Sequence, residues 1–149
     1  MNLPDYQHSS LVNLMSRLAR EFGANDQAYA AFEHEALAPL TDYQHIVLLI
    51  IDGMGARYLA RQTGYLHAHQ CAELTSVFPT TTASAITTFM TGLAPQQHGL
   101  TGWFTYLKEL GAVTAVLPFS CAAVAKLSLS VVSISLPYTA MYRFLICCR

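Results

Sequence analysis

Charged side chains are scarce in this chain of 149 residues. Asp, Glu, Lys and Arg make up 11% of it, whereas about 25% is typical of soluble domains. The eight Lys and Arg residues form no cluster and the formal net charge is −1, so the sequence offers no basic surface for nucleic acid. The segment Met1–Tyr6 lacks the basic and then apolar pattern of a secretory signal, and we therefore expect a cytoplasmic protein.

Cysteine is also used sparingly, and the spacing typical of metal sites is missing. Of the four cysteines, Cys71 stands alone, and Cys121, Cys147 and Cys148 lie within the last 29 residues. No CxxC pair occurs, and two adjacent cysteines are a poor signature of a disulfide or of zinc. We predict free thiols.

The end of the chain has no acidic residue. Residues 1–109 carry five basic and nine acidic groups, a net charge of −4, whereas residues 110–149 carry three basic groups and no acid, a net charge of +3. From Leu127 to Leu136, apolar residues alternate with serine over much of the run. The uncharged stretch Leu127–Tyr142 is 16 residues long, whereas a membrane helix needs about 20 apolar residues. We therefore predict a folded part over residues 1–118, and an apolar tail over residues 119–149 whose structure the pattern does not define.

The remaining pattern predicts helices alternating with strands. A short aliphatic run, His45–Ile51, is bounded by Asp52-Gly53 and is typical of a strand buried on both faces of a parallel sheet. The alternation indicates an α/β fold, with a mostly parallel sheet flanked by helices. The expected helices are one that Ser9 and Ser10 cap and that runs to about Glu21, a weaker Gln27–Ala36, Ala56–Gln62 and Thr82–Met90. The other expected strands are Ala72–Phe78 and Ala112–Leu117.

Two polar positions follow predicted strands. Asp52 ends the first strand, where open α/β sheets bind ligands and a carboxylate can hold a divalent cation. Thr82 ends the run Phe78-Pro79-Thr80-Thr81-Thr82 at the start of a helix, where free N–H groups suit a phosphate and a hydroxyl can be a nucleophile. Taken singly, each position is better explained by a structural role: Asp52 as a residue that turns the chain or caps a helix, and Thr82 as an ordinary N-cap.

Taken in order, these pieces are more specific. The sequence runs from a strand ending in Asp52-Gly53, through the F-P-T-x-T pattern that ends at Thr82, to Thr91-Gly92-Leu93-x-Pro95-x-x-His98-Gly99. This arrangement resembles the type I phosphodiesterases and nucleotide pyrophosphatases of the alkaline phosphatase superfamily. The resemblance covers about Ile46 to Trp103 and extends in part to Pro118. It implies a partial alkaline-phosphatase-like α/β fold, cut short in this chain.

The resemblance also implies roles for single residues. Asp52 would be a zinc ligand, and Thr82 would be the nucleophile and share that metal. His98 and Gly99 would shape the structure rather than catalyse. In the family, two zinc ions bind the phosphate and a covalent phosphothreonine forms and is hydrolysed. The expected partner is a phosphate ester or nucleotide-like small molecule, and neither nucleic acid nor a membrane is expected.

Three departures from the family pattern limit what it implies. Ala83-Ser84-Ala85 follows the nucleophile where many eukaryotic members have F-P-N, and Trp103 stands where those members place a phosphate-binding asparagine. Diester, monoester and phosphonate substrates therefore stay open. The family's remaining ligands, two aspartates and three histidines, lie downstream, but no Asp, Glu or His follows Glu109. The pair His67-x-His69 lies outside the family pattern, and we read it as a solvated loop.

The resemblance thus implies a metal-dependent hydrolase of phosphoric ester or pyrophosphate bonds, of which this chain holds only part. We expect the chain alone to be inactive, and the tail after Phe119 to be an out-of-frame product. One alternative is a small non-catalytic protein whose apolar tail docks on a membrane or a partner. Another is a chain that a second polypeptide completes by supplying the missing ligands.

Overall fold

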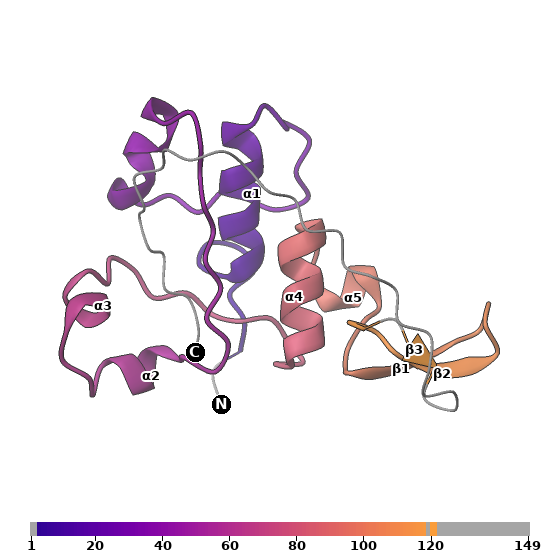
Figure 1. The fold of residues 1–149 in the computed structure, drawn as a ribbon. Coiled ribbons are helices and arrows are strands. Elements are labelled where there is room, and N and C mark those ends of the chain that lie inside the picture. Colours follow the sequence, from indigo (N-terminus) through magenta and orange to yellow (C-terminus); the bar gives the residue numbers. More distant parts are fainter. Residues whose placement is uncertain (1–2, 119, 122–149) are drawn as a thin grey trace.

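The computed structural model describes residues 3–118, 120 and 121. Its elements follow one another in a single chain of short helices that ends in a small sheet (Figure 1). They are α1 (Leu11–Glu21), η1, a 3-10 helix (Glu35–Asp42), α2 (Ala56–Leu59), α3 (Tyr65–Ala68), α4 (Thr82–Thr91), α5 (Pro95–His98), β1 (Phe104–Leu107), β2 (Ala112–Ala115) and β3 (Ser120–Cys121).

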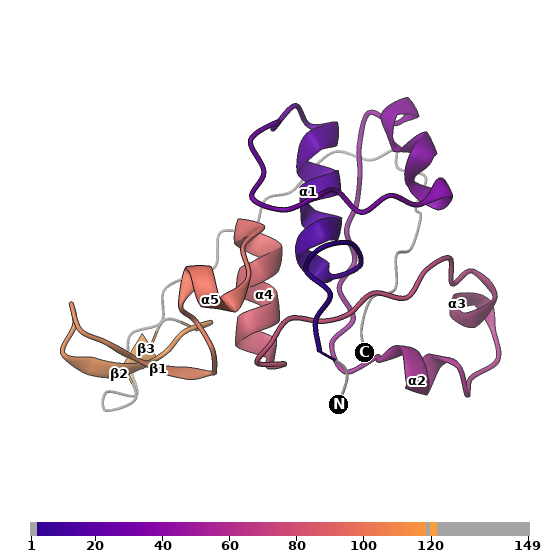
Figure 2. The same cartoon turned by 180° about the vertical axis from the view of Figure 1, so that it is seen from behind.

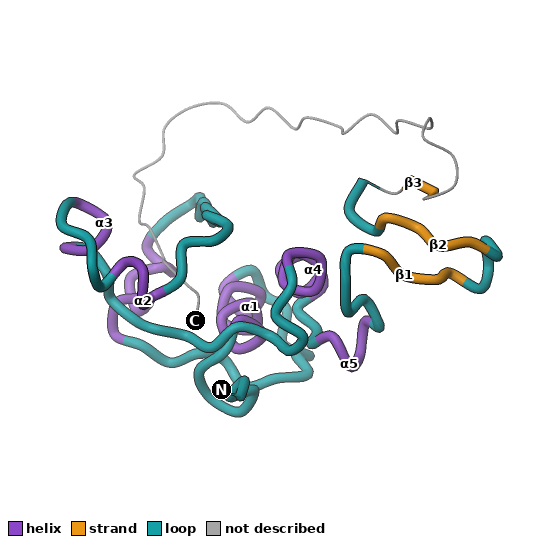
Figure 3. Tube along the Cα trace, turned by 90° about the horizontal axis from the view of Figure 1, so that it is seen from below, coloured by secondary structure: helices purple, strands orange, loops and turns teal. Residues whose placement is uncertain are grey.

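The helices α1 and α4 lie side by side at the centre of the molecule (Figures 1 and 2). The sheet lies at one end, and α2 and α3 lie at the other end (Figure 3). None of the described helices has the length and apolar character needed to cross a membrane.

The sheet has three antiparallel strands in the order β1-β2-β3. Phe104 pairs with Ala115 and Leu107 with Ala112, and Ala115 also pairs with Ser120 on β3. The predicted strand over residues 112–117 is therefore confirmed, but its neighbours are antiparallel. A mixed α/β structure is present, whereas the mostly parallel sheet is not found among the described residues. Those residues show one isolated parallel bridge, between Ser10 and Thr75.

Two small clusters of buried side chains hold the N-terminal segment against the rest of the chain. One cluster joins α1 and η1 to the chain before α4 through Leu14, Phe32, Leu37, Leu40 and Leu74. The other joins α1 to both sides of α4 through Leu11, Val12, Val77 and Ala94. The burial of each leucine, valine or phenylalanine side chain in these clusters stabilises the fold by about 2 kcal/mol. These contacts hold α1 in place.

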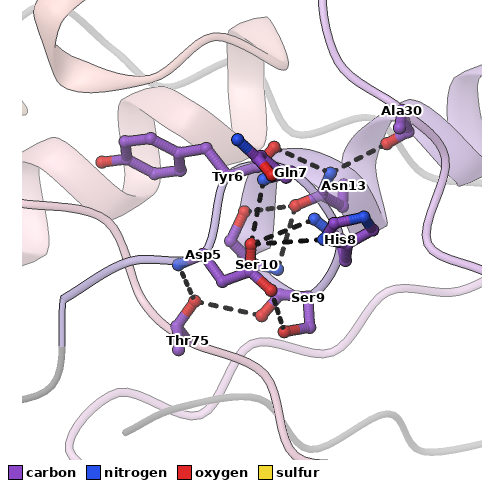
Figure 4. Close-up of polar contacts among 9 residues, drawn as sticks. All are labelled: Asp5, Tyr6, Gln7, His8, Ser9, Ser10, Asn13, Ala30 and Thr75. Atoms are coloured by element: carbon purple, nitrogen blue, oxygen red, sulfur yellow. Dashed lines mark hydrogen bonds and ion pairs between the residues drawn. The ribbon is translucent and has the colours of Figure 1, made fainter.

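A buried polar network closes the start of α1 (Figure 4). Asn13, which is fully buried, accepts hydrogen bonds on Oδ1 from the backbone N and the hydroxyl of Ser10, at 3.0 and 2.6 Å. Its amide nitrogen donates to the carbonyl oxygens of Tyr6 and Ala30, at 3.1 and 3.0 Å. The helix predicted to start after Ser10 and to end at Glu21 is confirmed, and Asn13 also fixes the two chain segments that flank it.

The helix predicted over residues 27–36 is wrong. Residues 24–34 form no helix, because α1 holds this segment through specific contacts. The backbone N–H of Phe32 donates to the carbonyl of Asn13 at 2.9 Å, and the hydroxyl of Ser16 donates to the carbonyl of Tyr29 at 2.6 Å. These bonds to another element replace the local ones that a helix would need.

The strand predicted at His45–Ile51 is also wrong for this structure. The segment runs without strand or helix, and Val47 and Leu49 are each 49% exposed. A strand buried on both faces needs a neighbour on each side, and no described strand lies beside these residues. The strand predicted over residues 72–78 forms only the bridge at Thr75. The helix predicted over residues 56–62 is present but stops at Leu59.

Candidate active site

Thr82 occupies the first position of α4. The helix begins there because the hydroxyl of Thr81, the N-cap, accepts a hydrogen bond from the backbone N–H of Ser84 at 3.2 Å. It ends after Thr91 because Gly92 takes a left-handed conformation, with φ of 71°, that other residues adopt at a cost. The helix predicted from Thr82 and closed by Gly92 is thus confirmed, and Thr82 itself is half-buried.

Asp52 lies in the turn between residues 45–51 and α2. The turn is formed with Gly53, whose φ is 74°. The side chain of Asp52 is exposed, but it reaches α4: Thr82 Oγ1 donates a hydrogen bond to Asp52 Oδ2 at 3.2 Å. The structure therefore brings the two site residues expected from the sequence into direct contact, across 30 positions of the chain.

Two further hydroxyls support the start of α4, and the sequence analysis did not single them out. The Thr81 hydroxyl lies 2.8 Å from that of the buried Ser84, and it also donates to the carbonyl of Thr101 at 3.4 Å. Sequence position alone does not reveal this contact, because Thr101 comes from the loop after α5. The backbone N–H groups of Thr82 and Ala83 have no hydrogen-bond acceptor within the described part of the chain.

His98 belongs to the junction of α4 and α5. Its Nδ1 accepts a hydrogen bond from the backbone N–H of Leu100 at 3.1 Å, so the proton of the neutral ring lies on Nε2. That nitrogen is 3.3 Å from the hydroxyl of Thr88, which is fully buried on α4. Burial lowers the pKa of His98 below its usual value, although backbone hydrogen bonds, including one to Ser84, act in the opposite direction. These contacts tie the end of α5 to α4.

The other residues singled out from the sequence lie apart from this pair. Trp103 precedes β1 and is 46% exposed, and no hydrogen bond joins its side chain to α4. His67 is exposed on α3, and His69 is exposed at the C-cap of that helix, where its ring stacks on Tyr65. They are solvated as predicted, although on a short helix rather than in a loop. Cys71 is an exposed free thiol, as predicted, whereas the tail Leu127–Tyr142 lies outside the described residues.

The described residues do not fit a pair of zinc ions by themselves. A catalytic zinc ion usually takes three protein ligands. Among residues 3–118, 120 and 121, no group of three His, Cys, Asp or Glu side chains is placed to hold a metal. Asp52 and Thr82 bring two oxygen atoms together, which is fewer than the three ligands that a catalytic zinc ion usually takes.

Comparison with known proteins identifies the segment that carries this pair. Residues 46–116 match the model of a family described as type I phosphodiesterase / nucleotide pyrophosphatase. No curated protein and no solved structure gave a significant match to the chain. The matched range contains Asp52, α4 and α5 and ends just after β2, which agrees with the range inferred from the sequence motifs. Through residues 46–116, the chain is thus similar to the type I phosphodiesterase / nucleotide pyrophosphatase family.

Proposed function

We propose that this chain carries the nucleophile of a hydrolase that cleaves phosphoric ester or pyrophosphate bonds, and that the nucleophile is Thr82. The observation that supports this most directly is the hydrogen bond from Thr82 Oγ1 to Asp52 Oδ2. A threonine hydroxyl is a weak nucleophile unless a neighbouring group accepts its proton or lowers its pKa. Asp52 is the one carboxylate bonded to this hydroxyl in the part of the chain that the structure describes.

The reaction would proceed in two displacements at phosphorus. Thr82 Oγ1 attacks the phosphorus atom, the bond from phosphorus to the leaving oxygen breaks, and the proton of the hydroxyl passes to Asp52 or to water. Water then attacks the phosphothreonine, which releases phosphate or a phosphate monoester and restores the hydroxyl. Each displacement is the ordinary chemistry of a covalent intermediate, which divides one difficult step into two easier ones.

The helix start next to Thr82 is suited to the anionic substrate. The N–H groups of Thr82 and Ala83 have no acceptor among the described residues, and they lie at the positive end of α4. Helix N-termini of this kind bind phosphate oxygens through their backbone amides. A phosphoryl group held there would lie beside the Thr82 hydroxyl.

We further propose that Asp52 and Thr82 are two ligands of a zinc site, as the family resemblance implies. The remaining ligands would be supplied by a polypeptide segment outside the described residues, either on a continued reading frame or on a second chain. The 149-residue chain alone would then be inactive in multiple turnover.

A covalent labelling experiment tests the role of Thr82. The full chain is incubated with bis(p-nitrophenyl) phosphate and zinc chloride, and phosphoryl adducts are located by mass spectrometry. We expect a slow, single-turnover adduct on Thr82 that is absent from Thr82→Ala. The matched control is Thr63→Ala, an exposed threonine in the turn between α2 and α3, which should leave the adduct unchanged.

Two results would contradict the proposal in different ways. An adduct on other residues with none on Thr82 would remove the nucleophile. Robust multiple turnover that depends on zinc and Thr82 would keep the nucleophile but refute the inactivity of the isolated chain. Addition of a polypeptide that supplies the missing ligands should raise the rate if the zinc site is shared between segments.

A further inference from the structure

Two tyrosines hold the chain on both sides of α4, and both lie outside residues 46–116, which we call the family segment. Tyr6 and Tyr29 precede residue 46, and their rings pack with centroids 6.1 Å apart and an interplanar angle of 56°. Both rings pack against the buried cluster that joins α1 to Val77 and Ala94. The pair is therefore anchored by apolar contacts, and its two hydroxyls point to different parts of the family segment.

The Tyr6 hydroxyl binds the chain just before the proposed nucleophile. Its oxygen accepts a hydrogen bond from the backbone N–H of Phe78 at 3.0 Å. Phe78 starts the run Phe78-Pro79-Thr80-Thr81-Thr82. The hydroxyl thus fixes the first residue of the loop that leads into α4.

The Tyr29 hydroxyl binds the chain just after α4. It is in hydrogen-bond contact with the side-chain oxygen of Gln97 on α5, and the same oxygen accepts the backbone N–H of Ala94 at 3.3 Å. Burial raises the pKa of Tyr29, so its proton is retained and available to donate. The tyrosine pair therefore spans α4 from its entry loop to its exit loop.

The entry loop depends on these contacts because it has little other support from backbone pairing. The chain before it, residues 72–78, forms no strand, and its one bridge joins Thr75 to Ser10. Thr75 is held there from the same N-terminal segment: its hydroxyl accepts the N–H of Asp5 at 2.9 Å and donates to the carbonyl of Ser9 at 3.0 Å (Figure 4). The residues that place Thr82 thus lie largely between residues 5 and 29.

We propose that Tyr6 is a positioning residue for Thr82, with Tyr29 as the side chain that supports it. This inference rests on the proposed role of Thr82 as the nucleophile. Loss of the Tyr6 hydroxyl leaves the ring in its apolar cluster but releases the N–H of Phe78. The loop from Phe78 to Thr81 then gains freedom, and Thr82 spends less time beside Asp52. A nucleophile displaced by about 1 Å can lose up to 100-fold in rate.

The test compares Tyr6→Phe with Tyr106→Phe in the full chain. Tyr106 is a 62% exposed tyrosine on β1, so its variant controls for the loss of a hydroxyl as such. The first readout is NMR: the hydrogen exchange of the Phe78 amide and the resonance of the Thr82 methyl group. The second is the rate of adduct formation on Thr82 with bis(p-nitrophenyl) phosphate and zinc chloride, measured against ester concentration.

For Tyr6→Phe we expect exchange of the Phe78 amide to rise about tenfold, as for the loss of one hydrogen bond, and the Thr82 methyl resonance to shift. The limiting rate of adduct formation should fall about tenfold or more, with the half-saturating ester concentration unchanged. Tyr106→Phe should change none of these.

A faster Phe78 exchange with an unmoved Thr82 resonance would overturn the inference, because Tyr6 would then be structural only. An unchanged limiting rate would overturn it as well. If wild-type Thr82 forms no adduct at all, the proposed function fails, whereas the NMR comparison still decides whether Tyr6 places Thr82. The two failures are thus distinguished.

Discussion

Thr82 and Asp52 meet through a single hydrogen bond of 3.2 Å, although 30 positions separate them in the chain. The bond joins the first residue of α4 to the turn before α2. No pairing of strands brings the two segments together in the described residues. The contact therefore depends in part on how α1 and the N-terminal segment hold α4.

The charge of Asp52 is tested by Asp52→Asn. The amide keeps an oxygen that can accept the Thr82 hydroxyl, but it cannot take the proton or bind zinc strongly. We expect the rate of Thr82 adduct formation to fall at least about tenfold and the free energy of unfolding to change by less than about 0.5 kcal/mol, because the side chain is exposed. Urea unfolding and mass spectrometry measure the two quantities. Asp26→Asn, also at an exposed site, is the control, and equal rates for both variants would refute the role of the Asp52 charge.

Asn13→Ala tests the buried network at the start of α1. The change removes four hydrogen bonds and leaves the carbonyls of Tyr6 and Ala30 and both groups of Ser10 without that partner. Unsatisfied buried groups cost about 1–3 kcal/mol each, and some will be rescued by water, so we expect a loss of about 2–4 kcal/mol. Urea unfolding followed by circular dichroism gives this value. Asn25→Ala, at an exposed position, should cost less than about 0.5 kcal/mol, and similar losses for the two variants would show that the network does not stabilise the fold.

Leu11→Ala tests whether the N-terminal segment and the family segment unfold together. Leu11 is fully buried and packs in one cluster with Val77 and Ala94. Truncation of a buried leucine costs about 2–5 kcal/mol, and the loss should appear equally in the fluorescence of Trp103 and in the circular dichroism of the helices. Leu3→Ala, at a position 73% exposed, is the matched control. Separate transitions for the two probes would contradict a single cooperative unit.

Local signals in the sequence predicted the two longest helices well. The serine before α1, the threonines before α4 and the glycines after both helices are capping residues, and capping depends on a few neighbouring positions. The same signals placed Thr82 at the start of a helix. The family resemblance then supplied Asp52 as its partner, and the structure places the two side chains in contact.

The errors lie where local pattern depends on distant neighbours. The aliphatic run at residues 45–51 predicts a buried strand, but a strand forms only beside another strand, and none is described next to it. Residues 27–36 have weak helical periodicity, but Asn13 and Ser16 of α1 bind their backbone in another conformation. The contacts of Tyr6 with the chain before α4 and of Tyr29 with α5 also join residues far apart in the chain, and no motif in the sequence signals them.

His98 makes the stability of the α4–α5 junction depend on pH. Burial lowers its pKa in the folded state below the value of about 6.5 expected in the unfolded state. Between these two pKa values the unfolded chain binds more protons than the folded chain. The free energy of unfolding therefore falls as the pH drops below about 6.5. Above that pH, the stabilising contribution of neutral His98 is fully present. Protonation also removes the acceptor of the Leu100 N–H, because Nδ1 then carries a proton.

His98→Gln should therefore be less stable than wild type at pH 7 and should lose less stability on acidification to about pH 5. Urea unfolding of both proteins at several pH values measures this difference. A curve for His98→Gln that runs parallel to that of wild type would show that the junction does not sense this proton.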